Sequence, residues 1–170
     1  AKVSALRFSQ DWLARDLRRV VAVRSQFSLG LDLFDATVND TGTDGRFFAW
    51  LGQFQWVERV SPNLLLVSRV NAQLTPNSLL PLERFSVGGQ DTVRGYAQNQ
   101  IVTDNAVVGS VELRIPLLAN PNQLLLIPFV DAGTGWNTLT ENPNPSMLLG
   151  TGLGVQWQPI PAASLGFTYG

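Results

Sequence analysis

The sequence has no cysteine and no histidine among its 170 residues. The absence of cysteine excludes disulfide bonds and thiol chemistry, and the absence of both residues excludes zinc sites built from Cys and His. A Ser–His–Asp triad is impossible without histidine, and the carboxylates lack the spacing of a metal site. We therefore expect no catalytic residues, no metal ligands and no cofactor.

The chain also has little net charge and no long hydrophobic run. Its net charge is −1 and no block of like charges occurs, which argues against nucleic acid as a partner. The Gly88-Gly89 pair lacks the Lys-Ser/Thr of a phosphate-binding loop, so we expect no nucleotide. No basic segment followed by an apolar run opens the chain, so it does not begin with a signal peptide. No uninterrupted run of about 18 apolar residues occurs, which excludes a helical membrane span. Because 45% of the residues are hydrophobic, a membrane protein remains possible if it crosses with strands.

The hydrophobic pattern has a period of two, which is typical of strands. Between residues 46 and 60, for example, the large apolar residues Phe48, Trp50, Phe54 and Trp56 all occupy even positions, whereas Gln53 and other polar residues occupy odd ones. The pattern predicts eight strands and no helix. The first is the end of a strand at 2–9, and the others cover 23–33, 46–60, 63–75, 106–117, 124–136, 147–158 and 162–170.

A soluble antiparallel sandwich also alternates in this way, but three features favour a transmembrane barrel. Several predicted strands are longer than the five or six residues usual in soluble sheets. The connections alternate between short ones near 10–15, 60–63, 118–123 and 158–161 and long ones at 35–45, 76–105 and 137–146, as in outer-membrane barrels. Trp56 and Trp157 lie beside short turns and Trp50 and Trp136 toward long loops, as two aromatic girdles require.

The polar positions of the strands predict a hydrated interior. A dry core would lose several kcal/mol for each unpaired polar group, whereas a water-filled lumen does not impose that cost. The side chains expected to face this lumen are Arg24, Asp32, Gln53, Gln55, Arg69, Asn71, Gln73, Glu112, Arg114 and Asp131.

Two motifs carry a resemblance to a known family. The stretch Gly88-Gly89-Gln90-x-x-Val93-Arg94-Gly95-Tyr96 resembles the sixth-loop signature of the BamA-type outer-membrane barrel superfamily. The surrounding RFSVGGQDTVRGYAQNQIVTDN (84–105) is most similar to its two-partner secretion branch, the haemolysin-activator transporters TpsB, ShlB/FhaC/HecB. Phe129-Val130-Asp131-Ala132-Gly133 matches a second family motif, aromatic-x-Asp-x-Gly, on the second strand after the loop.

The resemblance implies a fold and a role for Arg94. The loop, at about 84–104, would fold into the barrel, and its arginine would pair with Asp131 as a functional latch, because a guanidinium holds a carboxylate bidentately. Gly95 would allow a tight turn, Tyr96 would stack and hydrogen-bond, and Phe129 and Gly133 would shape the contact. Residues 1–170 would form the C-terminal part, about eight strands, of an antiparallel barrel of about sixteen strands. The last strand and the periplasmic POTRA modules would lie outside this sequence; two copies completing one small barrel is an alternative.

The expected function is that of a protein-translocating pore in the bacterial outer membrane. By resemblance, an unfolded client protein would be secreted through the lumen, and lipid would surround the barrel. An insertase or import channel of the same superfamily is an alternative. A passive porin or a soluble β-domain, in which the loop is incidental, is a further one.

Overall fold

The structure, a computed structural model, describes residues 3–31, 45–120, 123–160 and 163–170. These residues form one large antiparallel sheet of eight strands and a second sheet of two short strands. No helix in the described part of the chain is long and apolar enough to cross a membrane. The strands of the large sheet are β1 (Ser4–Arg15), β2 (Arg19–Leu31), β3 (Phe48–Ser61), β4 (Leu64–Leu74), β7 (Asn105–Pro116), β8 (Leu124–Trp136), β9 (Met147–Ile160) and β10 (Ala163–Tyr169).

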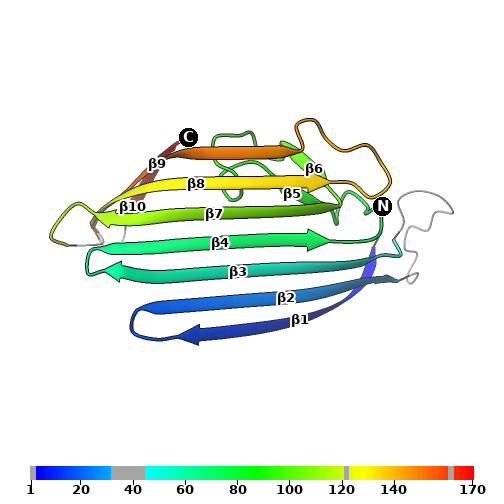
Figure 1. Ribbon diagram of the computed structural model, residues 1–170, viewed down its shortest axis with the longest axis horizontal. Coiled ribbons are helices and arrows are strands. Elements are labelled where there is room, and N and C mark those ends of the chain that lie inside the picture. The colour runs from blue at the N-terminus through cyan, green and yellow to red at the C-terminus, as the bar shows by residue number, and fades with distance from the viewer. Residues whose placement is uncertain (1–2, 32–44, 121–122, 161–162) are drawn as a thin grey trace.

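The strands of the large sheet lie in the order β1-β2-β3-β4-β7-β8-β9-β10, so each pairs with its neighbour along the chain except where the β4–β7 connection intervenes. Because all pairs are antiparallel, the connections alternate between the two ends of the sheet (Figure 1). The β2–β3, β4–β7 and β8–β9 connections share one end, as the alternation of loop lengths predicts. Residues 32–44 of the β2–β3 connection, which include Asp32, lie outside the described residues.

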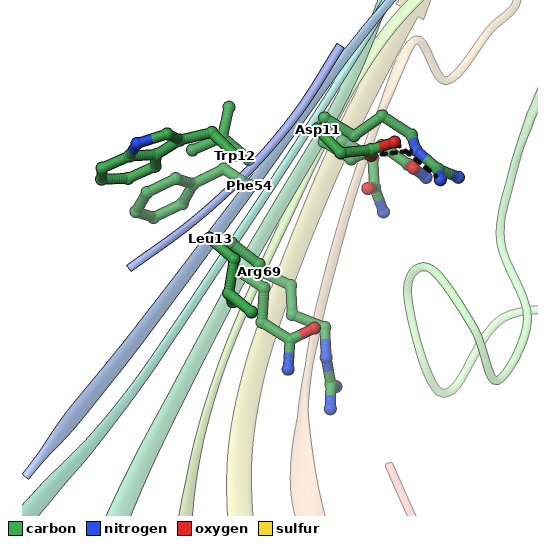
Figure 2. A pocket seen from close by; sticks show the side chains of 11 residues that line it. Asp11, Trp12, Leu13, Phe54 and Arg69 are labelled. Atoms are coloured by element: carbon green, nitrogen blue, oxygen red, sulfur yellow. Dashed lines mark hydrogen bonds and ion pairs between the residues drawn. The ribbon is translucent and has the colours of Figure 1, made fainter. Parts of the chain in front are cut away.

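The register separates the residues into two faces, which we name the apolar face and the loop face. Trp12 pairs with Val23, Val23 with Phe54 and Phe54 with Val70, which gives one row of the apolar face. Asp11, Arg24, Gln53 and Asn71 form the adjacent row on the loop face. Figure 2 shows this division, with Trp12 and Phe54 on one side of the strands and Asp11 and Arg69 on the other.

The predicted assignment of side chains to the two faces is confirmed in the described strands. The predicted apolar residues Phe48, Trp50, Phe54 and Trp56 share the apolar face, and Gln53, Arg69, Glu112 and Arg114 share the loop face. The apolar face also carries Leu113, Ile115, Leu153 and Trp157. Polar side chains pair across the loop face: Arg24 Nε lies 2.6 Å from Asp11 Oδ1.

The apolar face is exposed over its whole width. Trp12 is 59% exposed in β1, Leu149 is 61% exposed in β9, and Phe167 is 72% exposed in β10. A soluble sheet packs such a face against a second layer, and a continuous apolar surface of this size marks contact with a membrane or another protein. Strands of 11 to 14 residues in β1 to β4 and β7 to β9 are long enough to cross a bilayer.

The connection between β4 and β7 folds back over the loop face. Its two short strands, β5 (Phe85–Val87) and β6 (Ile101–Thr103), pair with each other and lie against β7 and β8. Beneath them is an apolar core of Val87, Val93, Ile101, Ala106, Val108 and Leu148. A second core, of Phe47, Ala49 and Leu79, packs the start of this connection against the N-terminal strands.

Two expectations from the sequence are corrected. The turn expected near 10–15 lies at 16–18, because Asp16 Oδ1 accepts the backbone N–H groups of Arg18 (2.8 Å) and Arg19 (2.9 Å) and closes the turn there. These two hydrogen bonds lower the pKa of Asp16 below its ordinary value. The two short strands inside the loop were not predicted.

The large sheet of the described residues is open, since β1 and β10 each have one neighbour, as expected for about eight strands of a larger barrel.

Candidate functional site

The site lies where the tip of the β4–β7 connection meets β7, β8 and β9. We call residues 75–104 the inserted loop, residues 88–100 its tip, and the remaining residues, together with Asn105, its base. The tip begins with two glycines at positive φ, Gly88 (106°) and Gly89 (104°). Gly88 N–H donates to Thr92 Oγ1 at 2.8 Å, and Gly89 N–H donates to the Val93 carbonyl at 3.2 Å. This compact turn directs Val93, which is fully buried, and Arg94 toward the sheet.

Arg94 and Asp131 form a bidentate ion pair. Arg94 Nε donates to Asp131 Oδ2 and Nη2 donates to Oδ1, both at 2.7 Å. The backbone N–H of Arg94 donates to the same Oδ2 at 3.0 Å. Asp131 is 1% exposed, so the carboxylate receives its charge compensation from the loop rather than from water. Parallel N–H···O bonds between a guanidinium and a carboxylate are among the stronger hydrogen bonds in proteins.

Glu112 is a second carboxylate in the site, and the sequence did not identify it as a partner of Arg94. Arg94 Nη1 donates to Glu112 Oε2 at 3.1 Å, and Nη2 also donates to Ser110 Oγ at 3.1 Å. Arg114 holds the other oxygen of Glu112 through Nε (3.0 Å) and Nη2 (2.8 Å). Arg69 Nη2 lies 3.8 Å from the same oxygen, so three arginines surround two carboxylates.

The electrostatics keep Arg94 charged. The hydrogen bonds that Arg94 donates to Asp131 raise the pKa of Arg94 above its already high value, and this outweighs the opposite effect of burial. A guanidinium does not lose its proton in this setting. The Arg94–Asp131 ion pair therefore does not depend on a change in the protonation state of Arg94.

An aromatic ring lies against the arginine of the ion pair. The guanidinium carbon of Arg94 lies 3.6 Å from the centre of the Phe129 ring, a cation–π contact. Tyr96 extends past the site, where its hydroxyl donates to the Leu149 carbonyl at 3.1 Å. Phe129 thus contacts Arg94 directly, whereas Tyr96 bonds to β9.

Glycines on the loop face give the tip room to approach. A Cβ at Gly133 would lie 2.9 Å from Val93 Cγ2 and 2.6 Å from Val87 Cγ1. A Cβ at Gly150, the register partner of Asp131, would lie 2.3 Å from the Arg94 carbonyl oxygen. Side chains at these positions would separate Arg94 from Asp131. Gly150 was not among the predicted site residues.

Two further predicted residues, Gln90 and Gly95, lie near the Arg94–Asp131 ion pair. Gln90 is exposed and lines a cavity of about 330 Å³ together with Arg69, Asn71 and Arg94. Gly95 adopts a φ of 91°, which an L side chain rarely tolerates. The structure thus brings all the predicted loop and strand residues to one side of the sheet, and adds Ser110, Glu112 and Gly150.

The arrangement is suited to holding a chain in place. Its charged groups are paired with one another. It can fix the tip against the loop face of the sheet with directional hydrogen bonds. Release of the tip would separate Arg94 from the carboxylates of Glu112 and Asp131.

Comparison with known proteins identifies similar sequences and folds. The sequence profile of the haemolysin secretion/activation protein family ShlB/FhaC/HecB matches residues 2–157. The outer membrane protein assembly factor BamA of Nitratidesulfovibrio vulgaris is 27% identical over 144 residues, which cover 76% of this chain and 18% of that protein.

Two solved structures share the fold. The structure of CdiB from Escherichia coli superposes with a TM-score of 0.81 at 21% identity, covering 98% of this chain and 32% of CdiB. BamA from Haemophilus ducreyi lacking POTRA domains 1–3 superposes with a TM-score of 0.74 at 18% identity, covering 97% of this chain and 38% of that one. The chain thus spans less than two fifths of the length of the proteins it matches.

Proposed function

The chain belongs to the haemolysin secretion/activation protein family ShlB/FhaC/HecB, and from that membership we propose that it forms part of the wall of a pore through which a partner protein is secreted. The family consists of outer-membrane transporters and not of enzymes, so the place of action is the bacterial outer membrane. The partner crosses as an unfolded chain, and no nucleotide drives it.

The two faces of the sheet support a pore wall. The apolar face offers exposed side chains from β1 to β10, which suits contact with lipid. The loop face carries arginine, glutamine and asparagine side chains along several strands, which suits contact with water and with a polar polypeptide. Closure of a barrel would need further strands beside β1 and β10, each of which has one neighbour in the described sheet.

The single observation that carries the mechanism is the bidentate pair of Arg94 with the buried Asp131. We propose that this pair is a latch that holds the tip of the inserted loop against the pore wall. Removing Arg94 leaves a poorly solvated carboxylate, which costs about 3 kcal/mol. The strands and their ladders do not depend on Arg94, so the latch is separable from the fold.

A second candidate function is insertion of other proteins into the outer membrane. The 27% identity with the assembly factor BamA of N. vulgaris favours it. In that function the substrate would contact the edge of the sheet rather than the loop face, which makes the two functions experimentally distinct.

The experiment compares two arginine variants of the full-length transporter. Arg94→Ala is expected to reduce secretion of the partner strongly while the protein still inserts into the outer membrane in heat-modifiable, folded form. Arg24→Ala is the matched control, because Arg24 also lies on the loop face and pairs with a carboxylate, Asp11, but in an exposed ion pair. Normal secretion by Arg94→Ala, or an equal loss in both variants, would contradict the latch.

A further inference from the structure

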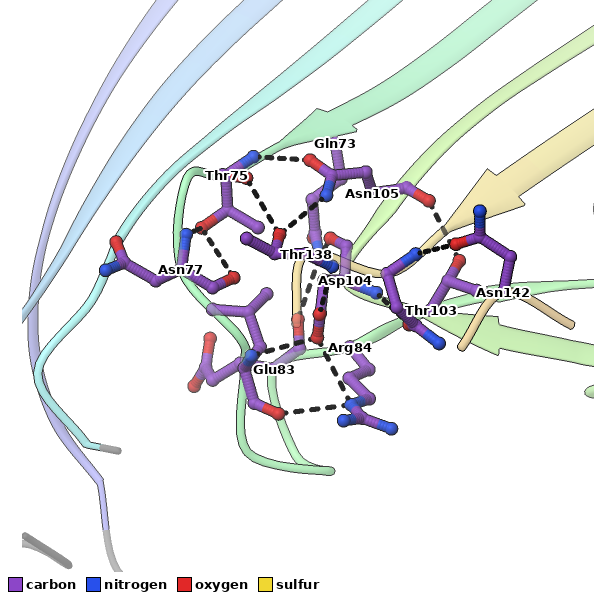
Figure 3. Close-up of polar contacts among 12 residues, drawn as sticks. Gln73, Thr75, Asn77, Glu83, Arg84, Thr103, Asp104, Asn105, Thr138 and Asn142 are labelled. Atoms are coloured by element: carbon purple, nitrogen blue, oxygen red, sulfur yellow. Dashed lines mark hydrogen bonds and ion pairs between the residues drawn. The ribbon is translucent and has the colours of Figure 1, made fainter. Parts of the chain in front are cut away.

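A second buried carboxylate, Asp104, lies at the base of the inserted loop and away from the latch. It is fully buried at the junction of β6 and β7 (Figure 3). Asp104 Oδ1 accepts the backbone N–H of Leu79 at 2.9 Å and lies 3.3 Å from Arg84 Nε. Asp104 Oδ2 accepts the backbone N–H of Thr138 at 3.0 Å. One carboxylate therefore joins both ends of the inserted loop to the β8–β9 connection.

Neighbouring polar groups extend the same junction. Asn105 Oδ1 accepts the Thr75 N–H at 2.7 Å, and Asn105 Nδ2 donates to Thr138 Oγ1 at 3.1 Å. Gln73 Nε2 donates to the carbonyls of Glu83 (2.9 Å) and Asp104 (3.1 Å). These bonds connect the end of β4, the start of β7 and the β8–β9 connection into one unit (Figure 3).

The tip is attached in a different way. Residues 95–100 are all exposed, and the tip reaches the sheet through Val93, Arg94 and the Tyr96 hydroxyl. The base combines buried backbone donors and acceptors with a buried charge, whereas residues 95–100 of the tip are exposed, and exposed segments open more readily than buried ones. Base and tip are thus two separately anchored parts of one loop.

We propose that Asp104 is a positioning residue that fixes the base of the inserted loop to the rim of the pore, and that movement of the loop during secretion is confined to residues 88–100. This inference rests on the proposed secretion function. Release of Arg94 then frees the tip while the point at which the loop enters the lumen stays constant.

An engineered disulfide tests the proposal in the full-length transporter with no other cysteines. The base lock is Thr103→Cys with Gly135→Cys, because a Cβ at position 135 would lie 3.3 Å from Thr103 Cβ.

The oxidised base lock is expected to secrete the partner as its reduced form does, because the base of the loop does not move. Loss of secretion on oxidation, with recovery on reduction, overturns the proposal. Neither result decides the outcome of the Arg94→Ala experiment, which tests the proposed function separately.

Hydrogen exchange tests the role of Asp104 itself. An asparagine at this position keeps one acceptor oxygen and turns its NH₂ group toward the N–H of either Leu79 or Thr138. Asp104→Asn is therefore expected to speed exchange of at least one of these two amides by about tenfold. Exchange at those amides should not change in Arg94→Ala, nor in Asp91→Asn, an exposed acid in the tip that serves as control. Unchanged protection of both amides in Asp104→Asn would overturn the positioning role.

Discussion

A single methyl group at Gly150 should undo the docking of the tip. Gly150 faces the inserted loop from β9, opposite Asp131, and a Cβ there would lie 2.3 Å from the Arg94 carbonyl oxygen. Ordinary contact begins at 3.4 Å, so the difference of 3.4 − 2.3 Å requires the tip to withdraw by 1.1 Å. Such a withdrawal along the bonds would lengthen the two 2.7 Å bonds to Asp131 to about 3.8 Å, which is beyond hydrogen-bonding distance.

The expected magnitude is that of overpacking a tight contact. Gly150→Ala should cost about 2 kcal/mol of docking free energy, or roughly a 30-fold rise in the undocked fraction. Gly154→Ala is the matched control on the same strand and face, because the nearest heavy atom to its Cβ would be 3.4 Å away, an ordinary contact.

The assay measures how often the tip leaves the wall. A cysteine at Val93, which is fully buried in the docked loop, reacts with a water-soluble maleimide only when the tip undocks. In otherwise cysteine-free transporter in outer-membrane vesicles, Gly150→Ala should label this cysteine roughly 30-fold faster than the parent, and Gly154→Ala at the parental rate. Equal labelling rates in the two variants would refute the close approach of the loop to β9.

Three further outcomes are expected. Arg94→Lys should restore only part of the secretion lost in Arg94→Ala, because an ammonium keeps the charge and loses the bidentate geometry; secretion equal to the parent would refute a role for that geometry. The charge swap Arg94→Asp with Asp131→Arg should recover more secretion when it is combined with Glu112→Gln, because Glu112 would otherwise repel the new aspartate. Equal recovery with and without Glu112→Gln would show that Glu112 has no role in the site. Cysteines at Gln53 and Phe54 should differ in labelling by a water-soluble, membrane-impermeant reagent, with position 53 faster, and equal labelling in intact membranes would contradict the two-faced wall.

The eight strands of the large sheet and its two faces could be predicted from the sequence, because a period of two survives wherever one side contacts an apolar phase. Trp50, Phe54 and Trp56 lie on the predicted side for this reason. The first turn could not be placed in the same way. Gln10 and Asp11 look like turn residues, but they continue β1, and Asp11 pairs with Arg24 across the strands.

The contacts of the inserted loop could not be predicted from the motifs alone, because they also depend on how the strands pair. Glu112 is one of many polar residues on the loop face, and only the β7–β8 register, which pairs Ser110 with Asp131, brings it beside Arg94. Asp104 is isolated in the sequence, and its partners come from segments 25 and 34 positions away. Long-range hydrogen bonds of this kind leave no local pattern.

The most direct test of the pore is to locate the partner protein during its passage. With a photo-crosslinking residue at Gln53 or at Phe54, and the partner stalled in the full-length transporter, crosslinks are expected from position 53 on the loop face and not from position 54 on the apolar face. Crosslinks of equal yield from both positions, or from position 54 alone, would contradict secretion along the loop face and favour a substrate that passes at the lipid side of the sheet.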